Sequence, residues 1–398
     1  MNQSKLWTKD FIIMFVSTLF VSLTFFLLMT TLTEYAVEEF NASQSMAGLV
    51  SSIFIVGALV ARLFAGKYIE IVGRKKMLYG GLGLFLVVML SYFIVENMNI
   101  LLLIRCLHGV AFGVFTTVIV TVVVDIIPNE RKGEGISYFS LSLILAMAVG
   151  PFLGIYLGQQ GNYTMIFAVC TLFSLIGSLI LLLVPIPKAD ITKEQIEAMK
   201  EFKLKEFFEI KAIPISVMMT IMAFAYSGIL SFINSYAIAI NIVDAASFFF
   251  IVYAFFILIS RPFTGRLLDK KGDNIVIYPA LVLFVIGLVT LSQASQGFTL
   301  LLAGALIGLG YGTLNSCFQA IAIKESPRHR VGLANSTFLV FMDSGTGFGP
   351  FLIGFIIPIV GFRGLYLTLA TLIFASIFLY YLLHGKKKRT EKNILQAS

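Results

Sequence analysis

The feature that most constrains this chain is a series of long stretches that contain no Asp, Glu, Lys or Arg. A helix needs about 20 apolar residues to cross the hydrocarbon core of a bilayer, which is about 30 Å thick. Four stretches have the length of one such helix and two have the length of a pair: residues 11–33, 40–61, 77–95, 106–124, 135–187 and 274–323. We expect further spans to start near Ala212 and Ala245, and two more after Arg330. The sequence therefore predicts twelve transmembrane helices.

The composition agrees with a chain whose main solvent is the lipid bilayer. Hydrophobic residues make up 58% of the chain and charged residues only 13%, which is too little polar side chain to cover a water-soluble surface. Polar breaks at 159–162 and 293–297 divide the two longest stretches into two spans each. No small-residue cleavage site follows the first stretch, so we interpret it as a retained helix and not as a signal peptide.

The positions of the basic residues predict the orientation of the chain. With the N-terminus in the cytoplasm, all but two of the 29 Lys and Arg residues lie at the inner ends of the helices; the exceptions are Arg105, inside a helix, and Arg363, in an outer loop. Acidic residues gather at the outer ends: Glu34, Glu38, Glu39, Glu96 and Asp244. This positive-inside distribution predicts a multi-pass protein of the cell (plasma) membrane with both termini cytoplasmic. It excludes a nucleic-acid partner as the reason for the net charge of +8.

An internal repeat divides the chain into halves. A shift of 199 residues aligns identical residues over a long register: Arg62/Arg261, Phe64/Phe263, Gly66/Gly265, Gly73/Gly272, Gly109/Gly308, Gly113/Gly312, Pro128/Pro327, Arg131/Arg330, Gly133/Gly332, Gly150/Gly349 and Pro151/Pro350. Parallel six-helix repeats are a known layout of transporters, in which the substrate binds between the halves. We therefore predict an all-α membrane protein of two pseudo-symmetric six-helix bundles, residues 1–187 and 212–398, the second ending in a basic tail.

The segment 188–211 between the bundles is predicted to be a cytoplasmic linker. Thr192 and Gln195 have the spacing of a helix capping box, and apolar residues follow at roughly helical intervals. A short amphipathic helix and a solvated tether are both compatible with this pattern. Three cysteines, Cys106, Cys170 and Cys317, lie inside predicted spans, where we interpret them as small packing residues. We expect no metal and no cofactor.

The loop between the second and third spans carries closely spaced glycines and charges. Gly66, Glu70, Gly73 and Arg74 occupy spacings that resemble motif A of the major facilitator superfamily, and the run from Gly265 through Asp269 to Gly272 resembles its second copy. The resemblance implies that Glu70 and Arg74 form a charge cluster with Asp125 that latches the outward-open state. Glu70 stands where the family usually has Asp, so the acidic side chain of the cluster is longer than usual. The alternative is that these charges only follow the positive-inside rule.

Two polar residues stand inside the fourth span. Arg105 and His108 lie in a run that resembles motif B of the same family, which implies a part in proton transfer. An arginine inside a membrane must be paired or face a wet cavity, so it is a functional candidate. His108 replaces the usual Gln; an imidazole titrates near neutral pH and suits a proton carrier, although a histidine hydrogen-bonded between helices is the more common case.

The fifth span resembles motif C, the signature of the antiporter branch. The residues that carry the resemblance are Gly150, Pro151 and Gly154, and Gly349 and Pro350 repeat the pair in the eleventh span. A Gly-Pro pair removes a hydrogen-bond donor and side-chain bulk, which lets a helix bend and a neighbour approach closely. Ile155 stands where the family often has a second Gly.

Asp343 is the one acid that falls well inside a predicted span. It follows Val331 by twelve residues, which places it about 18 Å into the membrane. A carboxylate there is costly, and burial favours its protonated form, so we predict a proton or substrate site with Glu34 as the next candidate. The alternative is an acid held permanently by neighbouring helices or paired with Arg105. Asp343-Ser-Gly also matches the local loop of aspartic proteases, but Ile144 stands at the repeated position and excludes the required pair of carboxylates.

The resemblance covers the chain from about Phe11 to Tyr381. It implies a monomeric secondary transporter and not an enzyme, most simply a proton-coupled exporter of small amphipathic compounds of the drug:proton antiporter branch. Its partners would be a small-molecule substrate, protons and the lipid bilayer. Two alternatives stay open: a dedicated exporter of an endogenous metabolite such as a metallophore or a sugar, and a membrane receptor or scaffold that transports nothing.

Overall fold

The structure of the protein is a computed structural model that describes residues 6–128, 131–187, 208–327 and 331–386. Within these ranges the chain is helical and contains no β-strand, so the all-α class is confirmed. Eleven of the described helices are long and apolar enough to cross a membrane. The chain divides into two compact units: Met1–Ala42 with Leu49–Phe202, and Ser43–Gly48 with Lys203–Ser398.

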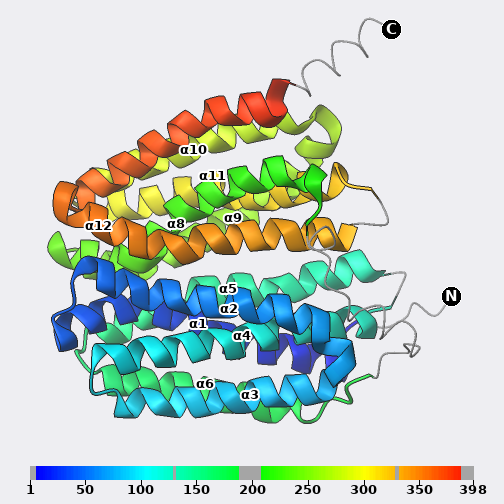
Figure 1. Cartoon of the computed structure of the whole chain (residues 1–398). Helices are drawn as coiled ribbons and strands as arrows, with labels where there is room; N and C mark the ends of the chain where they lie inside the picture. Colours follow the sequence, from blue (N-terminus) through cyan, green and yellow to red (C-terminus); the bar gives the residue numbers. More distant parts are fainter. Residues whose placement is uncertain (1–5, 129–130, 188–207, 328–330, 387–398) are drawn as a thin grey trace, which may run out of the picture. The chain divides into compact units, whose positions relative to one another are not determined.

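The first unit consists of long helices that run along a common direction (Figure 1). They are α1 (Lys9–Phe40), α2 (Gln44–Val72), α3 (Arg74–Ser91), α4 (Met98–Ile126), α5 (Lys132–Gly158) and α6 (Tyr163–Leu181). Helix α1 packs against α4, α5 and α6, and α3 packs against α4 and α6. Asparagine side chains start two of the helices: Asn97 accepts from the amide of Ile100 at 3.0 Å and Asn162 accepts from Met165 at 3.0 Å.

The second unit repeats this pattern with α8 (Ile213–Ala239), α9 (Val243–Lys271), α10 (Asp273–Ser292), α11 (Gly297–Lys324) and α12 (Val331–Tyr380). Helix α12 has a non-helical residue inside it, Gly361, with φ 68° and ψ 175°. Figure 1 shows α12 as an orange and a red helical stretch, which a turn joins on the left of the view. A single π-helical turn, Tyr381–Gly385, ends the described chain apart from Lys386.

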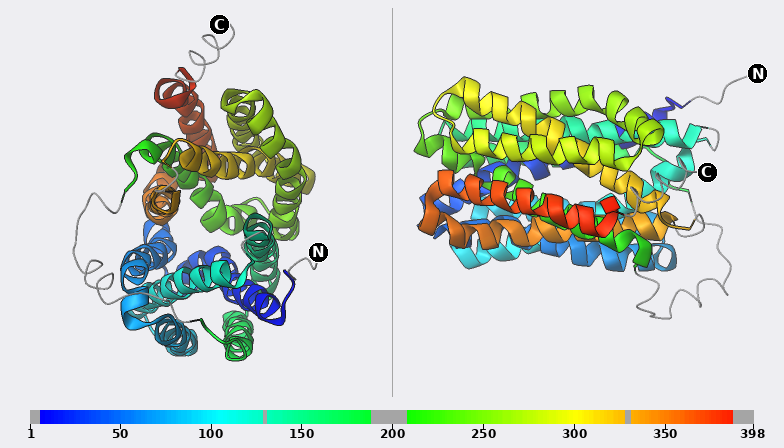
Figure 2. Two further views of the ribbon diagram at one scale, coloured as in Figure 1. Left: turned by 90° about the vertical axis from the view of Figure 1, so that its right-hand side faces the viewer. Right: turned by 90° about the horizontal axis from the view of Figure 1, so that it is seen from above.

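The polar breaks in the sequence fall where helices end. The segment 159–162 separates α5 from α6, and 293–296 separates α10 from α11. The views in Figure 2 show the helices of each unit end-on and from a second side. Most of the linker predicted at 188–211 lies outside the described residues; its last part forms the 3₁₀ turn Ile210–Ala212. Its amphipathic helix stays a prediction.

Glycines set the closest helix contacts, and they do so in the same register in both units. A Cβ on Gly109 of α4 would lie 1.9 Å from the backbone oxygen of Phe54 on α2. A Cβ on Gly308 of α11 would lie 2.4 Å from the backbone oxygen of Tyr253 on α9. Both distances leave no space for a side chain, so α2–α4 and α9–α11 approach to backbone contact. Residues 199 apart thus play the same packing role.

Candidate functional site

Arg105 lies fully buried in α4 and is held by groups from two other helices and the turn after α3. Its Nε donates to the backbone oxygen of Val50 at 2.9 Å, and a terminal nitrogen lies 3.5 Å from the Tyr92 hydroxyl. The guanidinium stands over the ring of Phe54, 4.4 Å from its centroid, and a second terminal nitrogen reaches the sulfur of Met29. No carboxylate pairs with Arg105 among the described residues, so dipoles and an aromatic face stabilise its charge.

His108 lies one turn further along α4 and shares a partner with Arg105. Its Nδ1 forms a 3.0 Å hydrogen bond with the Tyr92 hydroxyl, which therefore bridges the two residues. The imidazole packs edge-on against the rings of Phe54 and Phe85, with centroids 5.1 and 4.6 Å apart. Its Nε2 is buried, and in the part of the chain that the structure describes it has no hydrogen-bond partner.

The glycines of α2 and α4 make this cluster possible. A Cβ on Gly57 would lie 2.4 Å from the backbone oxygen of Cys106, and Gly109 meets Phe54 as described above. Because the two helices touch through these glycines, the carbonyl of Val50 and the ring of Phe54 come within reach of the Arg105 side chain. The sequence run Arg105 to Gly109 therefore combines the polar groups with the small residue that positions their partners.

Glu34, the other acidic candidate in this unit, is half-buried near the end of α1. It lies in an acidic and aromatic neighbourhood in which Tyr163 of α6 donates to Glu38 at 2.7 Å. Glu34 is close enough to Tyr163 to act on it electrostatically. The hydrogen bonds and ring contacts of Arg105 and His108 do not include Glu34.

Asp343 lies near the middle of the first stretch of α12 and is 8% exposed. Helix α12 packs tightly on α8 here: a Cβ on Gly345 would lie 2.3 Å from the backbone oxygen of Thr220, whose hydroxyl donates to Phe341 at 2.9 Å. The carboxyl group acts electrostatically on Tyr311 of α11. Asp343 thus belongs to a buried polar region that α8, α11 and α12 build together.

Three stacked tyrosines occupy the same region of the second unit. Tyr226 of α8 stacks on Tyr311 with ring centroids 4.2 Å apart and on Tyr253 of α9 with centroids 5.5 Å apart. All three rings are nearly inaccessible, at 5% exposure or less. We refer to Tyr226, Tyr253 and Tyr311 as the tyrosine stack. Sequence reasoning missed it, because isolated tyrosines in spans carry no motif.

The first unit has phenylalanines where the second has two of these tyrosines. The 199-residue shift aligns Phe54 with Tyr253 and Phe112 with Tyr311. The rings of Phe54 and Phe112 each stack on Phe25, at 5.0 and 5.1 Å. The aromatic packing is therefore shared, while the hydroxyl groups are specific to the unit that contains Asp343.

The predicted latch is described in part. Arg74, the first residue of α3, forms an ion pair with Asp125 near the end of α4. The Arg74 side chain is 10% exposed and that of Asp125 is 43% exposed. Gly73 has φ 97°, a value that side chains other than glycine rarely adopt, so the tight turn before α3 depends on it. The side chains of Glu70 and Asp269 and the packing around Gly66 lie outside the part of the chain that the structure describes.

The residues of motif C pack helices closely within each unit. A Cβ on Gly150 would lie 2.7 Å from the Phe26 Cβ, and one on Gly154 would lie 2.8 Å from the backbone oxygen of Leu27. In the second unit, a Cβ on Gly349 would lie 1.9 Å from the hydroxyl oxygen of Ser227. Pro151 and Pro350 follow two of these glycines inside continuous helices. The pattern brings α5 against α1 and α12 against α8.

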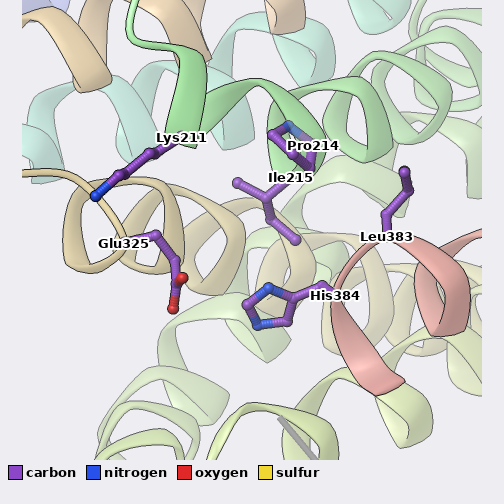
Figure 3. Close-up of a pocket in the computed structure, with 6 residues that line it drawn as sticks. All are labelled: Lys211, Pro214, Ile215, Glu325, Leu383 and His384. Atoms are coloured by element: carbon purple, nitrogen blue, oxygen red, sulfur yellow. The ribbon is translucent and has the colours of Figure 1, made fainter. Parts of the chain in front are cut away.

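A cavity of about 340 Å³ opens elsewhere in the second unit (Figure 3). It is lined by Lys211, Pro214, Ile215, Glu325, Leu383 and His384. None of the four proton or substrate candidates predicted from the sequence lines it. Among the described residues, no group of three His, Cys, Asp or Glu side chains is arranged to hold a metal ion.

Comparison with known proteins gives consistent matches along the chain. A model of the Major Facilitator Superfamily matches residues 14–272 and 243–397. The multidrug resistance protein MdtG of Dickeya zeae is 23% identical over 415 residues, which cover 97% of this chain and 97% of that protein. The staphylopine export protein of Staphylococcus aureus is 21% identical over 361 residues, which cover 87% of this chain and 89% of that protein. The crystal structure of a bacterial homolog of the human lysosomal transporter Spinster matches with a TM-score of 0.77 at 13% identity, covering 96% of this chain and 98% of that one; this likeness shows a shared fold.

Proposed function

Because this chain belongs to the Major Facilitator Superfamily, we propose that it is a twelve-helix, proton-coupled exporter of small amphipathic compounds. Eleven membrane-length helices are described, and the last contains the turn at Gly361. Counting the two stretches of α12 as separate spans gives twelve, six in each half. An even number of spans puts both termini on one side of the membrane, and we propose from the distribution of Lys and Arg that this is the cytoplasmic side of the cell membrane. We further propose that the protein acts as a monomer.

The observation that carries this proposal is the burial of Asp343 in α12, where it acts electrostatically on Tyr311 of the tyrosine stack. A carboxylate that is 8% exposed in a membrane helix is costly when charged, so it favours the protonated state unless water or a cation reaches it. A transporter that alternates between two accessible states exposes such a group to each side in turn. Loading a proton on one side and releasing it on the other would then drive export.

The surroundings of Asp343 favour amphipathic substrates with aromatic or cationic parts. The tyrosine rings are at most 5% exposed here, and an opening of this region during transport would offer a substrate flat apolar faces with hydroxyl groups at their rim. A carboxylate next to aromatic faces suits an organic cation, which gains from both. The multidrug resistance protein MdtG among the relatives supports this substrate class.

We assign Arg105 and His108 a supporting role in the first half. A proton on His108 would add a second positive charge beside Arg105 in one buried pocket, which electrostatics disfavours. His108 then acts as a neutral link that positions Tyr92, while proton loading falls to carboxylates, first Asp343 and then Glu34. Arg105 would change its interactions when a carboxylate elsewhere in the transport pathway gains or loses a proton.

One observation favours a second candidate, a dedicated exporter of an anionic metabolite such as a metallophore. Arg105 has no carboxylate partner among the described residues, and a carboxylate on a substrate would satisfy it. The staphylopine export protein among the relatives supports this alternative.

The experiment is transport by purified protein in proteoliposomes with an imposed pH gradient. Lipophilic cationic dyes test the first candidate, and metallophores with several carboxylates test the second. Accumulation of dye that collapses when a protonophore removes the gradient supports proton-coupled drug export. Accumulation of metallophore alone favours the second candidate, and absence of any flux favours a receptor or scaffold.

A further inference from the structure

The charges of the latch are inverted in the second unit. The 199-residue shift that aligns the two halves carries Arg74 onto Asp273 and Asp125 onto Lys324. Both pairs join the first residue of one helix to the end of the next: α3 to α4, and α10 to α11. Lys324 Nζ lies 3.5 Å from an oxygen of Asp273. Each unit therefore has an ion pair at the same place, with opposite polarity.

The inversion changes how each pair relates to its helices. The N-terminus of a helix carries partial positive charge and the C-terminus partial negative charge. Arg74 stands at a helix N-terminus and Asp125 near a helix C-terminus, so both residues oppose the helix dipoles. Asp273 stands at an N-terminus and Lys324 at a C-terminus, so both are favoured. Only the second pair is stabilised by its helices as well as by its own attraction.

Burial and a third partner reinforce the second pair. The side chain of Asp273 is 1% exposed, whereas that of Asp125 is 43% exposed. His384 Nε2 lies 2.8 Å from the other oxygen of Asp273 and is 7% exposed. His384 belongs to the π-helical turn Tyr381–Gly385, a form that is rare and often marks a functional position.

The residue after Asp273 fastens the same helices again. Asn274 donates from its amide nitrogen to the backbone oxygen of Gly385 at 3.0 Å and accepts from the Tyr380 hydroxyl at 2.9 Å. At the start of α10, Asp273 is therefore attached to the end of α11, and both Asp273 and Asn274 are attached to residues 380–385 at the end of the described chain. We call Asp273, Asn274, Lys324 and His384 the α10 clamp. His384 also lines the cavity in Figure 3.

We infer that the two pairs divide the work: the Arg74–Asp125 pair opens and closes, while the α10 clamp stays closed and keeps its end of the second half rigid. The opening of the first pair rests on the proposed transport function. The permanence of the clamp rests on the burial of Asp273 and His384, on the hydrogen bonds of Asn274 and on the helix dipoles, although Lys324 is 56% exposed. The stability that the clamp contributes is measurable without any substrate.

Thermal stability of purified protein tests the clamp directly. Asp273→Asn removes a buried charge that the Lys324 ammonium and the His384 ring face, so we expect the Tm in detergent to fall by roughly 5 °C or more. Asp125→Asn removes the acid of the first pair, a half-exposed charge that opposes a helix dipole, and should lower Tm by at most about 2 °C. If Asp273→Asn fails to accumulate, Lys324→Gln and His384→Gln decide the question, since each removes one partner and must lower Tm.

Exchanging the charges of the pair distinguishes two contributions to its stability: the attraction between residues 273 and 324, and the effects of the helix dipoles and His384. Asp273→Arg combined with Lys324→Asp keeps an oppositely charged pair but sets both residues against their helices and places a cation next to His384. We expect a Tm clearly below that of the wild type. A Tm equal to the wild type would overturn the inference, because mutual attraction alone would then account for the pair.

Transport rates test whether the Arg74–Asp125 pair opens during export while the α10 clamp stays closed. Lys324→Gln should keep the export rate within about twofold of the wild type, because a clamp that does not open adds no barrier. Asp125→Asn should slow export at least threefold. If Lys324→Gln and Asp125→Asn slowed export to the same degree and changed Tm equally, the two ion pairs would have the same role and the inference would be overturned. If the wild type transports nothing, the proposed function fails while the Tm comparison still tests the clamp.

Discussion

The ring of Tyr226 lies flat on the ring of Tyr311, with centroids 4.2 Å apart and planes inclined by only 8°. The two residues come from α8 and α11, so the stack fixes the distance between these helices. At the position equivalent to Tyr311 the first half has Phe112, which stacks without a hydroxyl group. The hydroxyl of Tyr311 is therefore not needed for packing and is available for function.

Tyr311→Phe should leave expression and Tm unchanged but weaken transport. The substitution keeps the ring and removes one hydrogen-bonding group that Asp343 influences electrostatically, so we expect KM for a cationic dye to rise about 3–10-fold. Initial rates in proteoliposomes over a range of dye concentrations measure it. Tyr278→Phe, on α10 at the other end of the unit, is the matched control. Unchanged kinetics for Tyr311→Phe would assign the stack to packing only.

Arg105→Ala should abolish coupled transport. The substitution removes a buried cation that four groups hold, and we expect at least a tenfold loss of pH-driven export. Arg105→Lys should keep a remnant, because Lys preserves the charge but not the planar set of donors that reaches Val50 and Tyr92. Arg363→Ala, at an exposed position, is the control for loss of an arginine. Export against a gradient by Arg105→Ala would reduce this residue to a packing role.

Arg74→Ala and Asp125→Asn should each reduce transport by roughly 3–10-fold while the protein still reaches the membrane. Each substitution leaves one member of the ion pair without its partner. Lys76→Ala, an exposed cation two residues away, should have little effect. Wild-type rates in both latch variants, measured at matched amounts of protein in the membrane, would show that these charges only determine topology.

The helices could be predicted where polar residues interrupt the apolar runs. Asn162 both breaks the apolar pattern and caps α6, so the residue that marks the helix start in the sequence also stabilises it in the structure. Gly361 ends a helical stretch through its φ of 68°, and Arg363, two residues later, already indicates an outer loop between the last two spans. The sequence indicates the loop but not the residue whose backbone conformation makes the turn.

The candidate site could be predicted only as single residues. A buried Arg and a buried Asp stand out in spans because charge inside a membrane is costly. The partners of Arg105 could not be predicted, since they are a backbone oxygen, a phenol and a ring on other helices. The inverted pair was visible in the repeat itself, because the same shift that aligns the glycines aligns Arg74 with Asp273. The role of His384 required the fold, which brings the π-helical turn Tyr381–Gly385 to the start of α10.

The topology predicts which cysteines are reached from outside the cell. In a background without native cysteines, Lys200→Cys in the predicted cytoplasmic linker should resist a membrane-impermeant maleimide on intact cells. Gln160→Cys, at the exposed turn between α5 and α6, should react. Labelling of position 200 from outside would contradict the positive-inside interpretation and reverse the orientation of every helix.

The Asp343→Asn substitution addresses proton coupling most directly. Asparagine has nearly the same shape and cannot bind or release a proton, so folding and expression should be kept. Asp244→Asn, an exposed acid in the first turn of α9, is the matched control. Glu34→Asn tests the second acidic candidate in the same series.

The decisive measurement is the initial rate of dye accumulation by Asp343→Asn in proteoliposomes, with and without an imposed pH gradient. We predict that the gradient accelerates the wild type and Asp244→Asn but leaves Asp343→Asn at its rate without a gradient, a loss of at least about tenfold in driven flux. Full transport by Asp343→Asn with an unchanged dependence on the pH gradient would contradict the assignment of this carboxylate as the proton site.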